Sequence, residues 1–146
     1  MDSKEAKTVA EFLVNDFENE MQTTLRVIQA VPTGHLDYRP DLKSKTGLGL
    51  LRHLALEDEW RLNCIANGAC KPPPDDSDSC GIMNPADAAA RYQEKVPVAL
   101  KRVRGMSGEQ LTKVIDLILR RSVPVPGRAA RAAVLGRSAA RVAPRD

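Results

Sequence analysis

The chain has 146 residues, of which 42% are hydrophobic and 28% charged, and its formal net charge is +3. This size is typical of a single domain that can bury a core. No stretch approaches the roughly 20 apolar residues of a membrane span, and the start, MDSKEAK, lacks the charged-then-apolar order of a signal peptide. We therefore expect a soluble, cytoplasmic protein with no membrane partner.

The net charge is the sum over two parts of the chain that differ in composition. Residues 120–146 contain seven arginines and seven alanines, a single acid, and neither lysine nor an aromatic residue. The preceding part is mildly acidic and mixed. Because a sharp change in amino-acid composition indicates a separate segment, we divide the chain into a helical domain, 1–117, and an Arg/Ala/Pro-rich tail, 118–146.

The first expected helix begins at Asp2 or Ser3, either of which can cap it, and stops before Pro32 and Gly34. Its apolar residues recur at intervals of three or four, which predicts one buried stripe. The stripe consists of Val9, Leu13, Phe17, Met21, Leu25 and Ile28.

A turn-rich segment, 33–47, precedes the second expected helix, which runs from the cap Thr46 to Gly68. One apolar side of this helix contains Leu48, Leu51, Ala55, Leu62 and Ile65. An adjoining stripe contains Leu50, His53, Leu54, Glu57, Trp60 and Cys64. A helix that is apolar over so wide an arc is expected to pack against more than one neighbour.

The loop 69–83 is rich in proline, acid and serine, which indicates an exposed connection. Asn84 and Pro85 then form the start of a third helix that ends at Gly105. Ser107 and Gln110 have capping-box spacing and open a short further turn. The apolar stripe of the third helix contains Ala89, Tyr92, Val96, Leu100 and Val103.

The three cysteines, Cys64, Cys70 and Cys80, are odd in number and lack the paired C-x-x-C spacing of structural zinc sites. In a cytoplasmic protein disulfides are rare. We therefore expect free, reduced thiols.

Three long helices with almost no alternating strand pattern predict an all-α bundle. A fourth helix could come only from the tail, where residues 127–143 have good helix formers. Its apolar face would be mostly alanine, which buries little area at about 25 cal/mol per Å². We therefore expect the fourth helix to be altered or poorly formed.

The stretch VPTGHLDYRPDLKSKTGLGLLRHLALEDEW resembles the second-helix signature of the DinB/YfiT-like family, and PVALKRVRGMSGEQL resembles that family's third helix and following turn. The resemblance covers residues 8 to about 117. It implies a four-helix bundle with a long crossover. It also implies metal-dependent chemistry, as a hydrolase or a thiol-dependent transferase, with a divalent ion such as nickel, zinc or manganese and a small-molecule or thiol substrate. We also expect the protein to form a homodimer.

His53 matches the family's first metal ligand, and the resemblance implies an imidazole that faces a central cavity. Glu57, one turn later, could ligate or orient the ion; the competing interpretation is a histidine simply paired with Glu57. The family's other two ligands are histidines of the last helix, and this chain has no histidine after His53. Since catalytic zinc normally keeps three protein ligands, we expect an incomplete site. No catalytic residue is assigned.

The tail allows two interpretations. Arginine, alanine, proline and glycine are frequent when GC-rich codons are read out of register, so a frameshift after about Asp116 is one hypothesis. Alternatively, the arginines bind nucleic acid nonspecifically through phosphates, without the aromatic residues that stack on bases. For the domain itself, the alternative to a metal protein is a non-catalytic helical module for binding or dimerisation.

Overall fold

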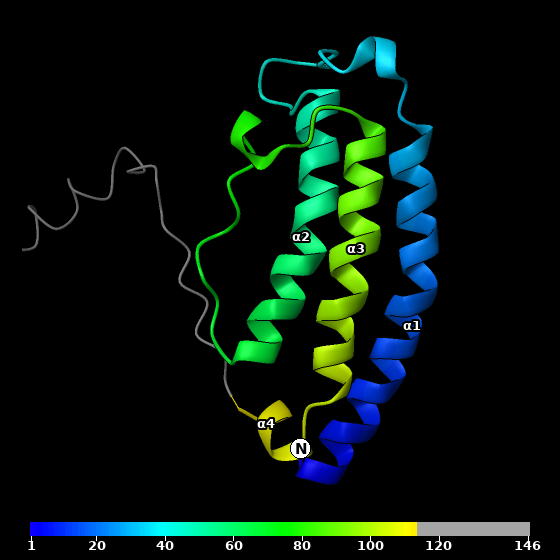
Figure 1. Cartoon of the computed structure of the whole chain (residues 1–146). Helices are drawn as coiled ribbons and strands as arrows, with labels where there is room; N and C mark the ends of the chain where they lie inside the picture. Colours follow the sequence, from blue (N-terminus) through cyan, green and yellow to red (C-terminus); the bar gives the residue numbers. More distant parts are fainter. Residues whose placement is uncertain (114–146) are drawn as a thin grey trace, which may run out of the picture.

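The computed structural model describes residues 1–113, and in this range every regular element is helical. The long helices are α1 (Ser3–Ala30), α2 (Gly47–Asn67) and α3 (Pro85–Arg104), and a short α4 (Gly108–Leu111) follows them (Figure 1). Two 3₁₀ turns lie at Thr33–His35 and Asp78–Cys80. The all-α prediction is thus confirmed at this level. The fourth helix, the tail and their interpretations concern residues outside the described range.

The helix ends lie where the capping residues predicted them. Asp2 accepts hydrogen bonds from the backbone of Lys4 and Glu5 and forms a capping box, and Thr46 caps α2 through the backbone N–H of Gly49. Gly68 ends α2 in the left-handed conformation, with φ of 65°, which glycine adopts without steric cost. Capping side chains therefore define the starts of α1 and α2, and the backbone conformation of Gly68 defines the end of α2.

The three long helices do not alternate in direction (Figure 1). α1 runs antiparallel to α2, whereas α3 runs parallel to α2 because the connection 68–84 returns along the bundle before α3 begins. We call this connection the crossover segment. α3 lies between α1 and α2 and packs against both, while α1 and α2 touch each other little. Among the helices that the structure describes, none covers the side of the bundle between α1 and α2.

The core contains the predicted stripe of α3 in full. The buried residues are Ala89, Tyr92, Val96, Leu100 and Val103. Four residues from the two stripes predicted for α2 are also buried, namely Leu51, Ala55, Leu62 and Cys64.

The stripe predicted for α1 is only partly buried. Met21 and Ile28 lie in the core, but Val9 and Leu13 are 43% and 56% exposed. Val14 is buried in their place, so the buried residues Val14, Met21 and Ile28 recur every seven positions. The prediction was wrong for Val9 and Leu13 because the neighbouring α3 reaches one face of α1 only.

Within residues 1–113 we find no helix long and apolar enough to cross a membrane.

Candidate functional site

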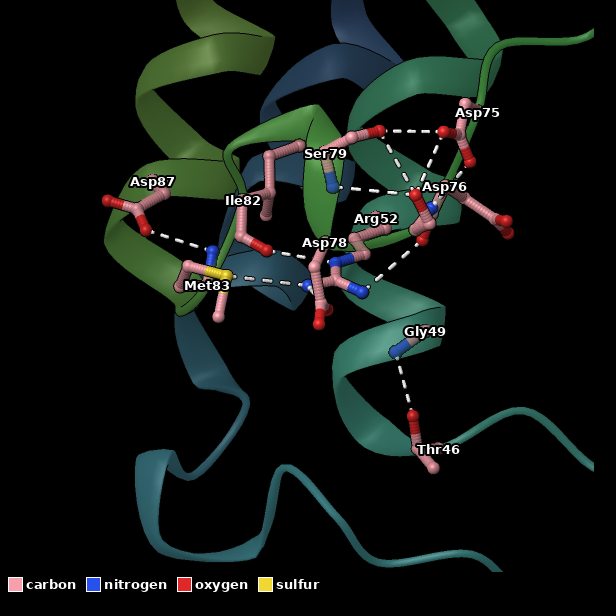
Figure 2. A network of polar contacts seen from close by, with 11 residues as sticks. Thr46, Gly49, Arg52, Asp75, Asp76, Asp78, Ser79, Ile82, Met83 and Asp87 are labelled. Carbon is pink, nitrogen blue, oxygen red and sulfur yellow. Dashed lines mark hydrogen bonds and ion pairs between the residues drawn. The ribbon is translucent and has the colours of Figure 1, made fainter.

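The crossover segment is held against α2 by a buried arginine (Figure 2). Arg52 is only 6% exposed. It donates from Nε to the carbonyl of Ile82 at 2.9 Å and from Nη1 to the carbonyl of Asp76 at 3.3 Å. Its Nη2 lies 2.7 Å from an Asp78 carboxylate oxygen. One guanidinium thus joins the first half of α2 to three points of a loop that is 24 to 30 residues away in sequence.

The sequence analysis missed Arg52. In the sequence it stands between Leu51 and His53 as one of several charged residues of the helix, and charged residues are usually exposed. Its carbonyl partners belong to a loop whose path cannot be read from α2. A buried arginine of this kind gives no local sequence signal.

The expectation of three free thiols was wrong for two of them. Cys64 and Cys70 form a disulfide, with Cα atoms 4.4 Å apart, and only Cys80 is free among the described residues. The left-handed turn at Gly68 folds the chain back over the last turn of α2. This reversal brings Cys70 next to Cys64. The indole of Trp60 donates to the Lys71 carbonyl at 2.9 Å and fixes the same part of the crossover segment.

Between the crossover segment, the second half of α2 and α3 lies a cavity of about 290 Å³, which we call the crossover pocket. Its polar lining comes from Glu59, Asn63, Asn67, Lys71 and Arg91, and Trp60 contributes an aromatic wall. Arg91 of α3 donates to Glu59 of α2 at 2.6 Å. This pocket combines charge, hydrogen-bond donors and an aromatic surface in one place.

On the open side of the bundle lies an apolar groove of about 310 Å³, which we call the α1–α2 groove. α1 contributes Val9, Leu13 and Phe17, α2 contributes Leu62 and Ile65, and α3 and α4 contribute further apolar side chains, including Leu111. Since Val9 and Leu13 are largely exposed, the groove is, among residues 1–113, an unpartnered hydrophobic surface of a kind that marks interaction sites.

His53 lies on neither of these surfaces. Its side chain is 44% exposed, and Nδ1 is 3.8 Å from a carboxylate oxygen of Glu57. Within the described part of the chain the core of α2 is formed by residues such as Leu51 and Ala55, and an orientation of the imidazole toward a central cavity stays a prediction. The other histidine, His35, is exposed in the first 3₁₀ turn.

The residues around His53 do not fit a three-ligand catalytic metal centre. Glu57 already accepts a hydrogen bond from Arg61 at 2.7 Å, so its carboxylate is partly neutralised. Among residues 1–113 no group of three or more histidine, cysteine or acidic side chains could hold a metal ion. A metal site formed by His53 and Glu57 therefore stays a prediction, and we expect it to bind a divalent ion only weakly.

A nickel titration followed by calorimetry tests this expectation. Because one imidazole and one ion-paired carboxylate leave most coordination positions to water, we expect no tight site in the wild-type protein. The variant His53→Ala should then behave like its control, His35→Ala. A tight site lost in His53→Ala but kept in His35→Ala would contradict the expectation. Arg61→Ala, which releases Glu57, should strengthen any weak binding.

A hydrogen bond between polar side chains joins α3 to α2. Tyr92 of α3 is buried, and its hydroxyl donates to Asp58 of α2 at 2.7 Å. Burial, followed by the neighbouring carboxylate, raises the pKa of Tyr92 well above its ordinary value. The phenol therefore stays protonated and remains a donor, which suits a structural tie between helices.

Comparisons with protein-family models, with curated proteins and with solved structures found no match to this chain.

Proposed function

We propose that this protein is a non-catalytic helical binding module of DinB/YfiT-like architecture, and that it associates with a second copy of itself through the α1–α2 groove. The observation that carries the proposal is the groove itself, which is open, apolar and lined by three long helices. Hydrophobic grooves between helices typically receive the apolar side of another helix. The parallel α2 and α3 and the long crossover support the architecture.

A second copy is the occupant that best matches this groove. Phe12 precedes the groove residue Leu13 and is 69% exposed, so each copy carries an aromatic anchor beside its own hydrophobic recess. In a twofold dimer both protomers use the same surface patch. The Phe12 ring of each protomer can therefore enter the α1–α2 groove of the other. Buried aromatic residues often dominate the binding energy of such interfaces.

Residues 127–143 of the chain's own tail are a weaker occupant by composition. The apolar residues of this stretch are mainly alanines, which bury little area compared with a phenyl ring or a leucine. The metal-dependent activities of the resembling family would need ligands beyond His53 and Glu57, and the described residues bring no third one to them. A binding role therefore agrees better with the geometry than catalysis.

Sedimentation velocity of the full chain tests the proposal. We expect a concentration-dependent dimer that dissociates at low protein concentration. Leu13→Glu should weaken the association at least tenfold, equivalent to about 1.4 kcal/mol, because the carboxylate would be buried in an apolar interface. The control is Val98→Glu, at a residue of α3 that is 61% exposed and lies outside the groove.

A wild-type protein that stays monomeric at all concentrations would contradict the dimer. In that case the labelling rates of the variants Leu13→Cys and Val98→Cys by a thiol reagent would distinguish the occupants. Selective protection of the cysteine at position 13 in a monomer would assign the groove to the chain's own residues after Lys113.

A further inference from the structure

We propose that the crossover pocket binds a small aromatic carboxylate. The pocket shares no lining residue with the α1–α2 groove, so the inference stands or fails separately from dimerisation. Three features of its lining, argued in turn below, select for negative charge, for hydrogen-bond acceptors and for a flat ring.

The two asparagines of the pocket present donors. Arg102 of α3 donates to the side-chain oxygens of both Asn63 and Asn67. Because a guanidinium can only donate, it fixes the orientation of both amides. Their NH₂ groups are thereby left for another partner, and a carboxylate is an acceptor that can use them.

The charges of the pocket also favour an anion. Arg91 and Glu59 form an ion pair and largely neutralise each other, while the Nε of Arg91 is buried without a hydrogen-bond partner among the described residues. The second cation of the lining, Lys71, has no carboxylate partner in the described range. A ligand carboxylate would supply the missing negative charge, and such charge-assisted hydrogen bonds are the strong ones.

The remaining walls are apolar and rigid. Trp60, Pro72 and Pro74 line this part of the pocket, and the Cys64–Cys70 disulfide and the Trp60–Lys71 hydrogen bond hold this wall in place. A volume of about 290 Å³ is near the lower limit, roughly 300 Å³, of small-molecule pockets. A ligand with one aromatic ring fits this size and can pack on the indole.

The chain has one tryptophan, and it lines the pocket, so its fluorescence reports binding directly. We would titrate the full-length protein with benzoate, benzamide and benzamidine, which share one ring and carry negative, zero and positive charge. Benzoate should quench Trp60 with a dissociation constant in the millimolar range, as expected for a fragment of this size. Benzamide should bind at least tenfold more weakly and benzamidine not at all.

Two variants and a control locate the site. Lys71→Gln, at an exposed loop residue, should weaken benzoate binding several-fold and leave benzamide unchanged. Arg91→Gln should weaken it at least tenfold, and Arg61→Gln, outside the pocket, should have no effect. The Trp60 indole N–H resonance provides a second readout. Absence of any benzoate response in both readouts, equal binding of the three ligands, or an unchanged benzoate affinity in Lys71→Gln would overturn the proposal.

Discussion

Replacement of Arg52 by alanine should lower the free energy of unfolding by about 2–4 kcal/mol, as judged from hydrogen bonds to charged groups and from the loss of a buried long side chain. The substitution removes the donors that hold the carbonyls of Ile82 and Asp76. It also leaves a void where a nearly fully buried side chain was packed. Urea denaturation followed by circular dichroism measures the change.

The matched control is Arg61→Ala, on the same helix. Arg61 is 67% exposed, and within residues 1–113 it pairs only with Glu57, one turn away, so its removal should cost about 0.5 kcal/mol or less. Arg52→Lys should recover little of the loss, because an ammonium group cannot reproduce the fork of donors that reaches separate points of the loop. Equal effects of Arg52→Ala and Arg61→Ala would show that the arginine does not anchor the crossover segment.

The second large effect is expected at Gly108, the first residue of α4. A Cβ atom at this position would lie 2.6 Å from the carbonyl carbon of Ser3 and closer still to its oxygen. Since the obstacle is backbone in the first turn of α1, it cannot swing away as a flexible side chain would. We expect Gly108→Ala to destabilise the protein by about 1–3 kcal/mol, the usual cost of overpacking, measured by thermal unfolding.

Gly34→Ala is the control for this substitution, because a Cβ atom at Gly34 meets nothing within 4 Å. It should be neutral, or stabilise slightly by restricting the unfolded chain. Gly108→Ala should also displace Leu111 from the end of the α1–α2 groove, with faster hydrogen exchange at its amide, which donates to the Ser107 carbonyl. An unperturbed exchange rate and stability would mean that α4 does not pack closely on the start of α1.

The contact that places α4 has a second component. Lys7 of α1 donates to the carbonyls of Arg104 and Met106, at 2.7 and 3.0 Å. These carbonyls lie at and just beyond the end of α3, where unpaired acceptors need partners. The end of α3 is thus tied to the start of α1, and this tie directs the chain into α4 beside the groove.

Local structure was predictable because it depends on residues that are close in sequence. The caps at Asp2, Thr46, Asn84 and Ser107 satisfy backbone N–H groups within three residues, and this chemistry can be read directly from the chain. The prediction of the α3 stripe was also correct, because α3 has neighbouring helices on two sides and these cover all the residues of the stripe.

Features that depend on the path of the crossover segment could not be predicted. Arg52 is buried because the end of this segment, distant in sequence, returns to the first half of α2. The Cys64–Cys70 disulfide and the crossover pocket arise because the start of the segment folds back over the second half of α2. The spacing of the cysteines gave no indication of pairing, because their proximity depends on the reversal at Gly68. The donors of the pocket likewise come from two helices whose relative rotation no periodicity determines.

The amino-acid sequence by itself determined the three long helices, their ends and most of the core, because capping and apolar periodicity are local properties of the chain. Only the tertiary structure decided which apolar and charged residues remained exposed. Val9, Leu13 and His53 have the spacing of buried residues, yet they are exposed because burial requires a neighbouring element on that face. A helix can specify its own apolar faces, but it cannot specify which of them another helix will cover.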